Sequence, residues 1–244
     1  MAVHHDNNAG HRPGTPLWPL PLAIALTLTV AVHLAWALSL HAGHVPPCIP
    51  YLEGCTSISR AARHGVGNHL FRLLVLPCAL LVGLHWWLAA RWLHVRAARG
   101  AGEARMILLL GVIAAIALGL YATFLGSEGP AYRFLRRYGV IVFFGTSYLV
   151  QLLFLRAAHR QDRLGPSIRR TMTAICIAML ALGVTNVVAD ATMADAARQD
   201  RLENALEWHL GVLLVAWYVA QALLWRSSGF DVAIRRGAGN GVRP

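Results

Sequence analysis

The chemistry of this sequence centres on one carboxylate, Glu207, inside the apolar stretch from Leu202 to Trp225. The stretch is long enough to cross a bilayer once, and an ionisable side chain there costs about 2.5 kcal/mol or more unless it is paired or hydrated. We therefore interpret Glu207 as part of a functional site with a partner elsewhere in the chain. The residues that share its helical face, at steps of three and four, are Asn204, Gly211, Leu214, Tyr218 and Gln221. This face is predicted to point into the protein.

Polar side chains recur at the same end of the neighbouring apolar stretches. The opposite charges and similar depths of Arg72 and Glu207 predict that they form a bidentate ion pair. Two readings of that pair stay open. The pair locks the helices together, or it belongs to a site in which arginines receive a phosphate while a carboxylate, Glu207 or Asp190, acts as acid or base. The other residues of the membrane spans predicted to bind a headgroup at this end are Asn68, Arg136, Arg137, Asn186 and Asn204.

Two histidines lie near this cluster, and their positions differ. His33 is about 10 Å below the outer end of the first apolar stretch at 1.5 Å per residue, and we include it among the candidate headgroup ligands. A single histidine at that depth is also typical of hydrogen-bonded packing. His209 follows Glu207 closely in sequence but points about 200° away from it at 100° per residue. We therefore exclude His209 from a pair with Glu207.

The loop after the first apolar stretch is the longest connection in the chain and is rich in turn residues, serine and arginine. Its two cysteines, Cys48 and Cys55, could form a disulfide in an oxidising compartment, and two free thiols are the alternative. Loops of this length in compact proteins are usually functional. We expect the loop to fold over the end of the bundle and to bring the hydroxyls of Ser57 and Ser59 towards Arg72 and Glu207.

The apolar stretches that must position these residues predict an all-α polytopic membrane protein, a bundle of six transmembrane helices. With 57% hydrophobic and 14% charged residues, the chain leaves no room for a soluble domain. Residues 1–17 are predicted to be a disordered cytoplasmic leader, 18–226 the membrane domain, and 227–244 a basic cytoplasmic tail. The predicted spans are 18–40, 69–93, 105–125, 137–156, 169–189 and 204–225.

The net charge of +11 is distributed unevenly between the two ends of the bundle. With the N-terminus placed in the cytoplasm, that side carries fourteen arginines and four acids, a net charge of +10, whereas the other side carries eight arginines and seven acids, a net charge of +1. The positive-inside rule therefore predicts that both termini are cytoplasmic. Since all 22 basic residues are arginine, which is typical of a high-GC genome, we expect a bacterial inner-membrane protein whose long first loop is periplasmic.

The six-span layout, the tripeptide Ser57-Ile58-Ser59 in the first outer loop, and the pair Glu207-Trp208 at the start of the last span resemble the Frag1/DRAM/Sfk1 family. That family includes the PGAP2-like proteins and the N-terminal region of the Cwh43 proteins. The resemblance implies an integral membrane protein, linked in the PGAP2-like branch to lipid remodelling of GPI anchors and in the DRAM branch to autophagy. A bacterium without GPI anchors would need another lipid as the substrate.

Three functions therefore remain in competition. The first is a protein that handles a phosphate-bearing lipid, as a hydrolase or an acyl or lipid transferase. The second is a membrane organiser without enzymatic activity, since neither loop serine lies in a GxSxG context. The third is a haem-binding electron-transfer subunit that would use two of its histidines, His33, His69, His85, His94 and His209. We predict a membrane lipid as the partner, with no cofactor, metal or nucleic acid, and leave protein partners open.

Overall fold

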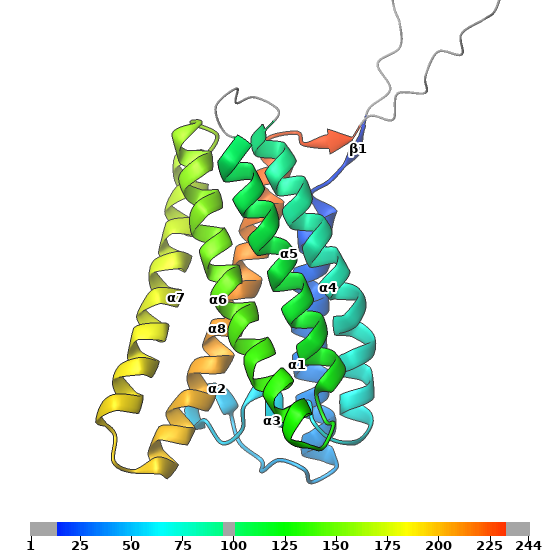
Figure 1. Cartoon of the computed structure of the whole chain (residues 1–244), viewed down its shortest axis with the longest axis vertical. Helices are drawn as coiled ribbons and strands as arrows, with labels where there is room; N and C mark the ends of the chain where they lie inside the picture. The colour runs from blue at the N-terminus through cyan, green and yellow to red at the C-terminus, as the bar shows by residue number, and fades with distance from the viewer. Residues whose placement is uncertain (1–13, 95–100, 233–244) are drawn as a thin grey trace, which may run out of the picture.

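The computed structural model describes residues 14–94 and 101–232 and consists of six long helices with two short helices in one loop. All six long helices have the length and apolar composition needed to cross a membrane. They run side by side as one elongated bundle (Figure 1). The predicted all-α six-span architecture is therefore confirmed. The long helices are α1 (Pro19–His41), α4 (Gly65–His94), α5 (Ala101–Phe124), α6 (Pro130–Arg160), α7 (Pro166–Thr192) and α8 (Ala196–Ser227).

Most helices extend beyond the apolar stretches that predicted them. Helix α6 begins at Pro130, seven residues before the predicted span, and carries Arg133, Arg136 and Arg137 near its start. Proline is favoured in the first turn because its missing donor would be unpaired there. Inside α4, Pro77 is accommodated without ending the helix, as expected. The helix ends therefore project beyond the apolar core, where charged side chains can reach water or headgroups.

Small residues on α5 allow it to approach α4 closely. A Cβ atom added to Gly111 would lie 2.2 Å from the Cβ of Trp86, and one added to Gly119 would lie 4.0 Å from the Cβ of Ala79. In the sequence, Gly111, Ala115, Gly119 and Thr123 recur at four-residue steps, a small-residue stripe that predicts close helix packing, and the approach at Gly111 confirms it. Helix α5 packs in turn on α6, while α1 packs on both α4 and α8, and α7 packs mainly on α8.

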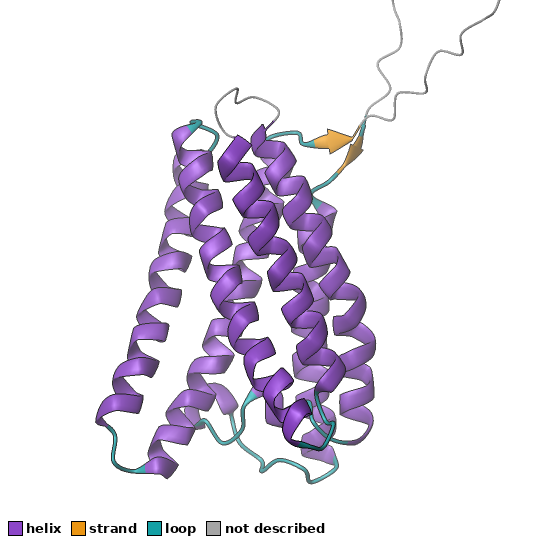
Figure 2. Ribbon diagram, in the orientation of Figure 1, coloured by secondary structure: helices purple, strands orange, loops and turns teal. Residues whose placement is uncertain are grey.

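The two ends of the described chain meet beside the bundle. Strand β1 (Thr15–Pro16) pairs antiparallel with β2 (Asp231–Val232), and both strands lie at the end opposite the first loop (Figure 2). Four residues of the predicted leader, 14–17, and the start of the predicted tail therefore have a defined structure. The rest of the leader and the tail from residue 233 lie outside the described residues.

The loop between α1 and α4 contains two short helices, α2 (Pro50–Glu53) and α3 (Ile58–Ala61). Both pack against α8, and α3 also packs against α1. Ser57 caps α3, since its side-chain oxygen accepts a hydrogen bond from the backbone nitrogen of Arg60 at 3.1 Å. The loop thus covers one end of the bundle and does not extend away from it (Figure 1).

Candidate functional site

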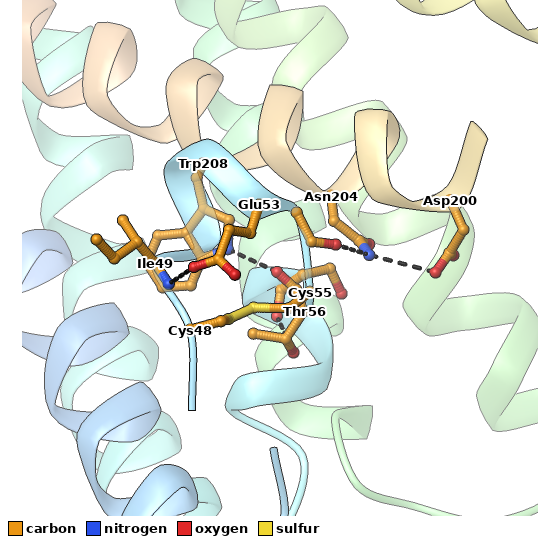
Figure 3. The surroundings of a disulfide bond; sticks show 10 residues. Cys48, Ile49, Glu53, Cys55, Thr56, Asp200, Asn204 and Trp208 are labelled. Carbon is orange, nitrogen blue, oxygen red and sulfur yellow. Dashed lines mark hydrogen bonds between the residues drawn. A yellow bond between two sulfur atoms is a disulfide. The ribbon is translucent and has the colours of Figure 1, made fainter. Parts of the chain in front are cut away.

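A disulfide between Cys48 and Cys55 closes the part of the loop that contains α2, as predicted, with the two Cα atoms 6.5 Å apart. Within this closed segment the backbone nitrogen of Ile49 donates to the Glu53 carboxylate at 2.7 Å. Figure 3 shows the disulfide beside the first turns of α8, from which Asn204 and Trp208 point towards the loop. The covalent link and these contacts hold the loop in one conformation.

Two side chains of α8 bind the loop backbone directly. The indole nitrogen of Trp208 donates to the carbonyl oxygen of Thr56 at 2.9 Å. The side-chain amide nitrogen of Asn204 donates to the carbonyl oxygen of Gly54 at 2.8 Å (Figure 3). A bidentate ion pair joins Arg60 of α3 to Asp200 of α8 at the surface. This ion pair raises the pKa of Arg60. Exposed pairs of this kind contribute about 0.2–1 kcal/mol, so the buried Trp208 and Asn204 bonds are the stronger anchors.

Tyr51 of α2 is held by aromatic contacts and by His33. The Nδ1 atom of His33 lies 2.8 Å from the carbonyl oxygen of Thr29, which can only accept, so Nδ1 carries a proton. In the neutral ring Nε2 is then an acceptor, and it receives the hydroxyl of Tyr51 at 2.8 Å. The Tyr51 ring also lies 5.1 Å from that of Trp208. Burial raises the pKa of Tyr51, so the phenol stays protonated and keeps its role as donor.

Glu207 meets Ser59 and Tyr121 at the end of the bundle that the loop covers. Its Oε1 atom accepts from the backbone nitrogen of Ser59 at 3.3 Å and from the Ser59 hydroxyl at 3.4 Å. The Ser59 hydroxyl also lies 3.0 Å from the hydroxyl of Tyr121 on α5. Three segments far apart in sequence, α3, α5 and α8, therefore bring a carboxylate and two hydroxyls together.

Directly below this group lies a cavity of about 250 Å³, lined almost entirely by apolar side chains of α1, α4, α5, α6 and α8. Its polar lining residues include Tyr51, Tyr121 and Glu207 beside the loop, His33, which bonds Tyr51, and Thr29, one turn further along α1. Val212 also lines the cavity and is 49% exposed, so the cavity opens on the side of the bundle that faces lipid. The deeper lining includes Phe71, Val75, Leu118, Phe143, Leu214 and Val215.

Two arginines that form no salt bridge within the described residues lie beside this group. Arg63 is half-buried, and its Nε atom is buried without a hydrogen-bond partner in the described structure. Burial lowers the pKa of Arg63, and the charges of Arg136 and Arg60 lower it further, whereas Tyr121 and Glu207 act in the opposite direction. Arg136 is also half-buried, and its side chain donates to the carbonyl oxygen of Ser127 at 3.5 Å. An anion placed between Arg63 and Arg136 would relieve this repulsion.

The predicted ion pair between Arg72 and Glu207 is wrong. Within residues 14–94 and 101–232 the ion pairs are Arg60 with Asp200 and Arg160 with Glu103. Arg72 is half-buried on α4 and does not line the cavity. The hydroxyl and backbone nitrogen of Ser59 replace it as the partners of Glu207.

The sequence predicts that one inward face of α7 carries Cys176, Met179, Gly183, Asn186 and Asp190. The structure buries Cys176 and Met179 but not the outer part of this face. Asn186 and Asp190 are both exposed, and Asp190 accepts a hydrogen bond from Gln199 of α8 at 2.8 Å. Asp190 therefore lies apart from the cavity and is not placed to act as acid or base there. Arg137 is exposed on α6, one position away from the half-buried Arg136. His209 is exposed, in agreement with its exclusion from a pair with Glu207.

Besides His33, whose ring nitrogens bond Thr29 and Tyr51, three predicted headgroup ligands, Asn68, Asn204 and Ser57, are held by bonds within the protein. The amide nitrogen of Asn68 donates to the carbonyl oxygens of Ala62 and Leu125, both at 2.9 Å, and ties α4 to two neighbouring segments. Asn204 binds the loop through Gly54, and the side chain of Ser57 caps α3. These contacts occupy the polar atoms that a headgroup would need, so the three residues shape the site without binding to a ligand.

Two residues of this site, Tyr51 and Tyr121, were not predicted from the sequence. Tyr121 lies on α5, which the small-residue stripe identified only as a packing helix, and it is fully covered by its neighbours. Its signal in the sequence is a phenol on an otherwise apolar helix, near the end where Glu207 is found. Tyr51 follows the diproline segment of the loop, and only the fold shows that it reaches His33.

The described part of the chain contains no cluster of three or more His, Cys, Asp or Glu residues arranged to hold a metal ion. Both ring nitrogens of His33 have hydrogen-bond partners, and His85 is packed among Trp86, Tyr218 and Trp225 in the other half of the bundle. These two histidines therefore do not converge. Searches with family models, curated proteins and solved structures found no match to this chain.

Proposed function

We propose that this protein binds a phosphate-bearing membrane lipid at the loop end of the bundle, with one hydrocarbon chain in the cavity and the headgroup towards Arg63 and Arg136. The observation that carries the proposal is the cavity itself, which is apolar along its depth and ends at a carboxylate and two phenols. Ligand sites commonly combine an apolar lining with a few polar groups that fix orientation. The fixed loop above the cavity supplies the remaining polar contacts.

A hydrocarbon chain suits the interior of the cavity for two reasons. Its deeper walls are aliphatic and aromatic, so a polar ligand would lose its hydrogen bonds there without replacement. The exposed position of Val212 provides a lateral entrance, through which a chain of the surrounding bilayer can enter without crossing water. The chain would end near Glu207, where the polar part of the lipid begins.

The phosphate is assigned to Arg63 and Arg136 on electrostatic grounds. Guanidinium groups bind phosphate oxygens through paired hydrogen bonds, and partial burial strengthens such bonds. Arg63 has a buried donor atom that nothing in the described structure satisfies. The headgroup would therefore lie between the loop and the start of α6.

The distribution of charge supports an inner-membrane location with this site on the periplasmic side. A disulfide in the same loop agrees with an oxidising compartment. Alkaline phosphatase inserted at Gly43, an exposed turn of the loop, is expected to be active in a bacterial host. An inactive insertion, together with activity of the same reporter fused to the C-terminus, would reverse the orientation.

Filling the cavity tests the proposed binding. A Cβ atom added to Gly211, which lines the cavity, would lie 3.3 Å from the flexible end of Ile58. We expect Gly211→Leu to reduce the phospholipid that remains bound in native mass spectrometry at least about tenfold, equivalent to 1.4 kcal/mol. The matched control is Gly183→Leu on α7, where an added Cβ atom meets nothing within 4 Å.

Arg63→Ala with Arg136→Ala should weaken retention of anionic phospholipids, whereas Arg133→Ala, an exposed position on the same helix as Arg136, should not. Equal lipid retention by wild type, Gly211→Leu and the double arginine variant would contradict the proposal. If only the arginine variant retains lipid normally, the cavity is the site and the headgroup assignment is wrong.

A second candidate function is that of a membrane organiser, in which Glu207 only fixes the loop. It is favoured by the hydrogen bond from the Ser59 backbone nitrogen to Glu207, which is a structural contact. Glu207→Gln separates the two functions because glutamine keeps an acceptor oxygen for that nitrogen but cannot take up a proton. A folded Glu207→Gln protein that fully complements a strain lacking the wild-type protein would favour the organiser.

A further inference from the structure

We propose that Ser59 is a nucleophile that takes the acyl chain of an ester-linked lipid, an inference that rests on the proposed lipid binding. The cavity would hold the hydrocarbon part of the chain, and Ser59 would receive its carbonyl carbon. The substrate class is an O-acyl ester lipid, and the product of the first step is an acyl-serine on this chain. The proposal thus names a covalent reaction for the site, beyond binding.

The direction of the hydrogen bonds prepares the Ser59 hydroxyl for this role. An ionised carboxylate can only accept, so the 3.4 Å contact with Glu207 requires the Ser59 hydroxyl to donate its proton to Glu207. The Ser59 oxygen is then an acceptor for the Tyr121 hydroxyl, 3.0 Å away. A nucleophilic hydroxyl that points its proton at an adjacent base is the arrangement needed for covalent catalysis.

The neighbouring hydroxyls in the loop are engaged differently. The Ser57 oxygen accepts from the Arg60 backbone nitrogen, and the Thr56 hydroxyl donates to the Ser57 carbonyl at 3.3 Å. Neither has a carboxylate partner in the described structure, and both residues are buried. Ser59 is half-exposed and bonds two residues of the cavity wall, Tyr121 and Glu207, without lining the cavity itself. Of these three loop hydroxyls, Ser59 is the one with both a base and access.

The position of Ser59 relative to the cavity supports the same assignment. Its two side-chain partners, Tyr121 and Glu207, both line the cavity, as does its sequence neighbour Ile58. A chain that fills the cavity would therefore have its polar end beside Ser59. Arg63, whose charge acts on both Tyr121 and Glu207, is close enough to oppose the negative charge that develops on the ester.

The reaction then proceeds in two balanced steps. In the first, a bond forms between the Ser59 oxygen and the acyl carbon, the bond from that carbon to the lipid oxygen breaks, and the Ser59 proton passes through Glu207 to the departing alkoxide. In the second, water or the hydroxyl of a second lipid attacks the acyl carbon, and the bond from that carbon to the Ser59 oxygen breaks. The proton of the attacking group passes to Glu207 and on to the Ser59 oxygen, so that Ser59 is restored and the fatty acid or acylated lipid is released. No oxidant or reductant is needed.

A hexadecyl fluorophosphonate probe tests the nucleophile directly, because reaction forms a bond from the serine oxygen to phosphorus and releases fluoride. We expect peptide mass spectrometry of the full chain in nanodiscs to locate the adduct at Ser59. Ser59→Ala should remove it, and Ser127→Ala, a serine beyond the end of α5, should not. Glu207→Gln should slow labelling about 100-fold or more, the usual contribution of a general base.

Folding is checked separately by the intact disulfide and by a single peak in size-exclusion chromatography. A folded wild-type protein that retains phospholipid but is not labelled at Ser59 would overturn this inference and leave the proposed function intact. Labelling at Ser59 that is equally fast in folded Glu207→Gln would overturn the role of Glu207 as the base. The Gly211→Leu test measures lipid binding in the cavity and therefore tests the proposed function, whereas labelling of Ser59 tests the nucleophile.

Discussion

At the scale of single residues, Glu207 combines two tasks that its environment makes compatible. Its Oε1 atom holds the backbone of Ser59 and accepts the Ser59 hydroxyl, so the same carboxylate fixes the loop and is in place to take up a proton. The sequence predicted that Glu207 has a partner, because an unpaired charge in a span is costly. It also predicted that the folded loop brings the Ser59 hydroxyl towards Glu207, but it named Arg72, and not Ser59, as the partner.

Substitution of Glu207 should separate these tasks. Glu207→Ala leaves the Ser59 backbone nitrogen without its acceptor, which costs about 1–3 kcal/mol for a buried donor. Glu207→Gln keeps the acceptor and should unfold close to the wild-type temperature. Thermal unfolding in detergent, followed by tryptophan fluorescence, measures both. Equal destabilisation by the two substitutions would show that the charge, and not the acceptor oxygen, holds the loop.

At the scale of helices and loops, the sequence was a good guide to what each element is and a poor one to how the elements face each other. Hydropathy gave the spans, and the cysteine spacing gave the disulfide. The periodicity of α8 correctly placed Asn204 and Tyr218 on a buried face. The predicted pair of Arg72 with Glu207 is wrong because the position of a residue along its span gives its depth in the membrane but not the rotation of its helix. Arg72 lies on α4 and Glu207 on α8, and α1 packs against both of these helices.

The same limit explains α7 and Tyr121. Asn186 and Asp190 share a helical face with the buried Cys176 and Met179, yet α7 packs mainly on α8 and leaves this outer part of the face exposed. Tyr121 belongs to an apolar helix and becomes part of the site only because α3 lies across the end of α5. Contacts made by a loop that folds back over a bundle depend on the whole fold, and one sequence does not contain them in a local pattern.

The packing of α5 on α4 can be tested at two glycines of the same stripe. Gly111→Ala would place its Cβ atom 2.2 Å from the Trp86 Cβ atom, so α5 must shift, at a cost of about 1–3 kcal/mol for overpacking. Gly119→Ala meets Ala79 at 4.0 Å, an ordinary contact, and should unfold like wild type. Thermal unfolding of the two variants in one detergent makes the comparison. Equal unfolding temperatures would contradict the close approach at Gly111.

The disulfide should keep the loop closed over the site. Cys48→Ser with Cys55→Ser removes a short covalent loop, which costs about 2–3 kcal/mol in the chain-entropy model. The remaining anchors, Trp208 and Asn204, hold the loop less tightly, so we expect faster trypsin cleavage at Arg60 and Arg63 in intact membranes. Cys78→Ser, at a buried free cysteine in α4, is the control for loss of a thiol. Cleavage as slow as in wild type would show that the non-covalent anchors suffice.

At the scale of the whole molecule, the bundle is polarised along its long axis. The paired strands lie at one end, and the loop with α2 and α3 lies at the other (Figure 1). The Cys48–Cys55 disulfide and the contact of Ser59 with Glu207 belong to the loop end. The charge distribution predicts that the strand end is cytoplasmic. A lipid of the opposite leaflet would then enter past Val212 and place its headgroup beneath the loop. Under the proposed function, α1, α4, α5, α6 and α8 line the lipid site, and α7 packs outside it against α8.

The most direct test of this account is photo-crosslinking with a phospholipid that carries a diazirine in its acyl chain. We expect the crosslinked peptides from wild-type protein in nanodiscs to contain cavity residues such as Phe143 and Val215, and we expect Gly211→Leu to remove these crosslinks. Crosslinks confined to exposed bilayer-facing positions such as Leu26 and Leu80, unchanged by Gly211→Leu, would contradict the claim that the cavity holds a lipid chain.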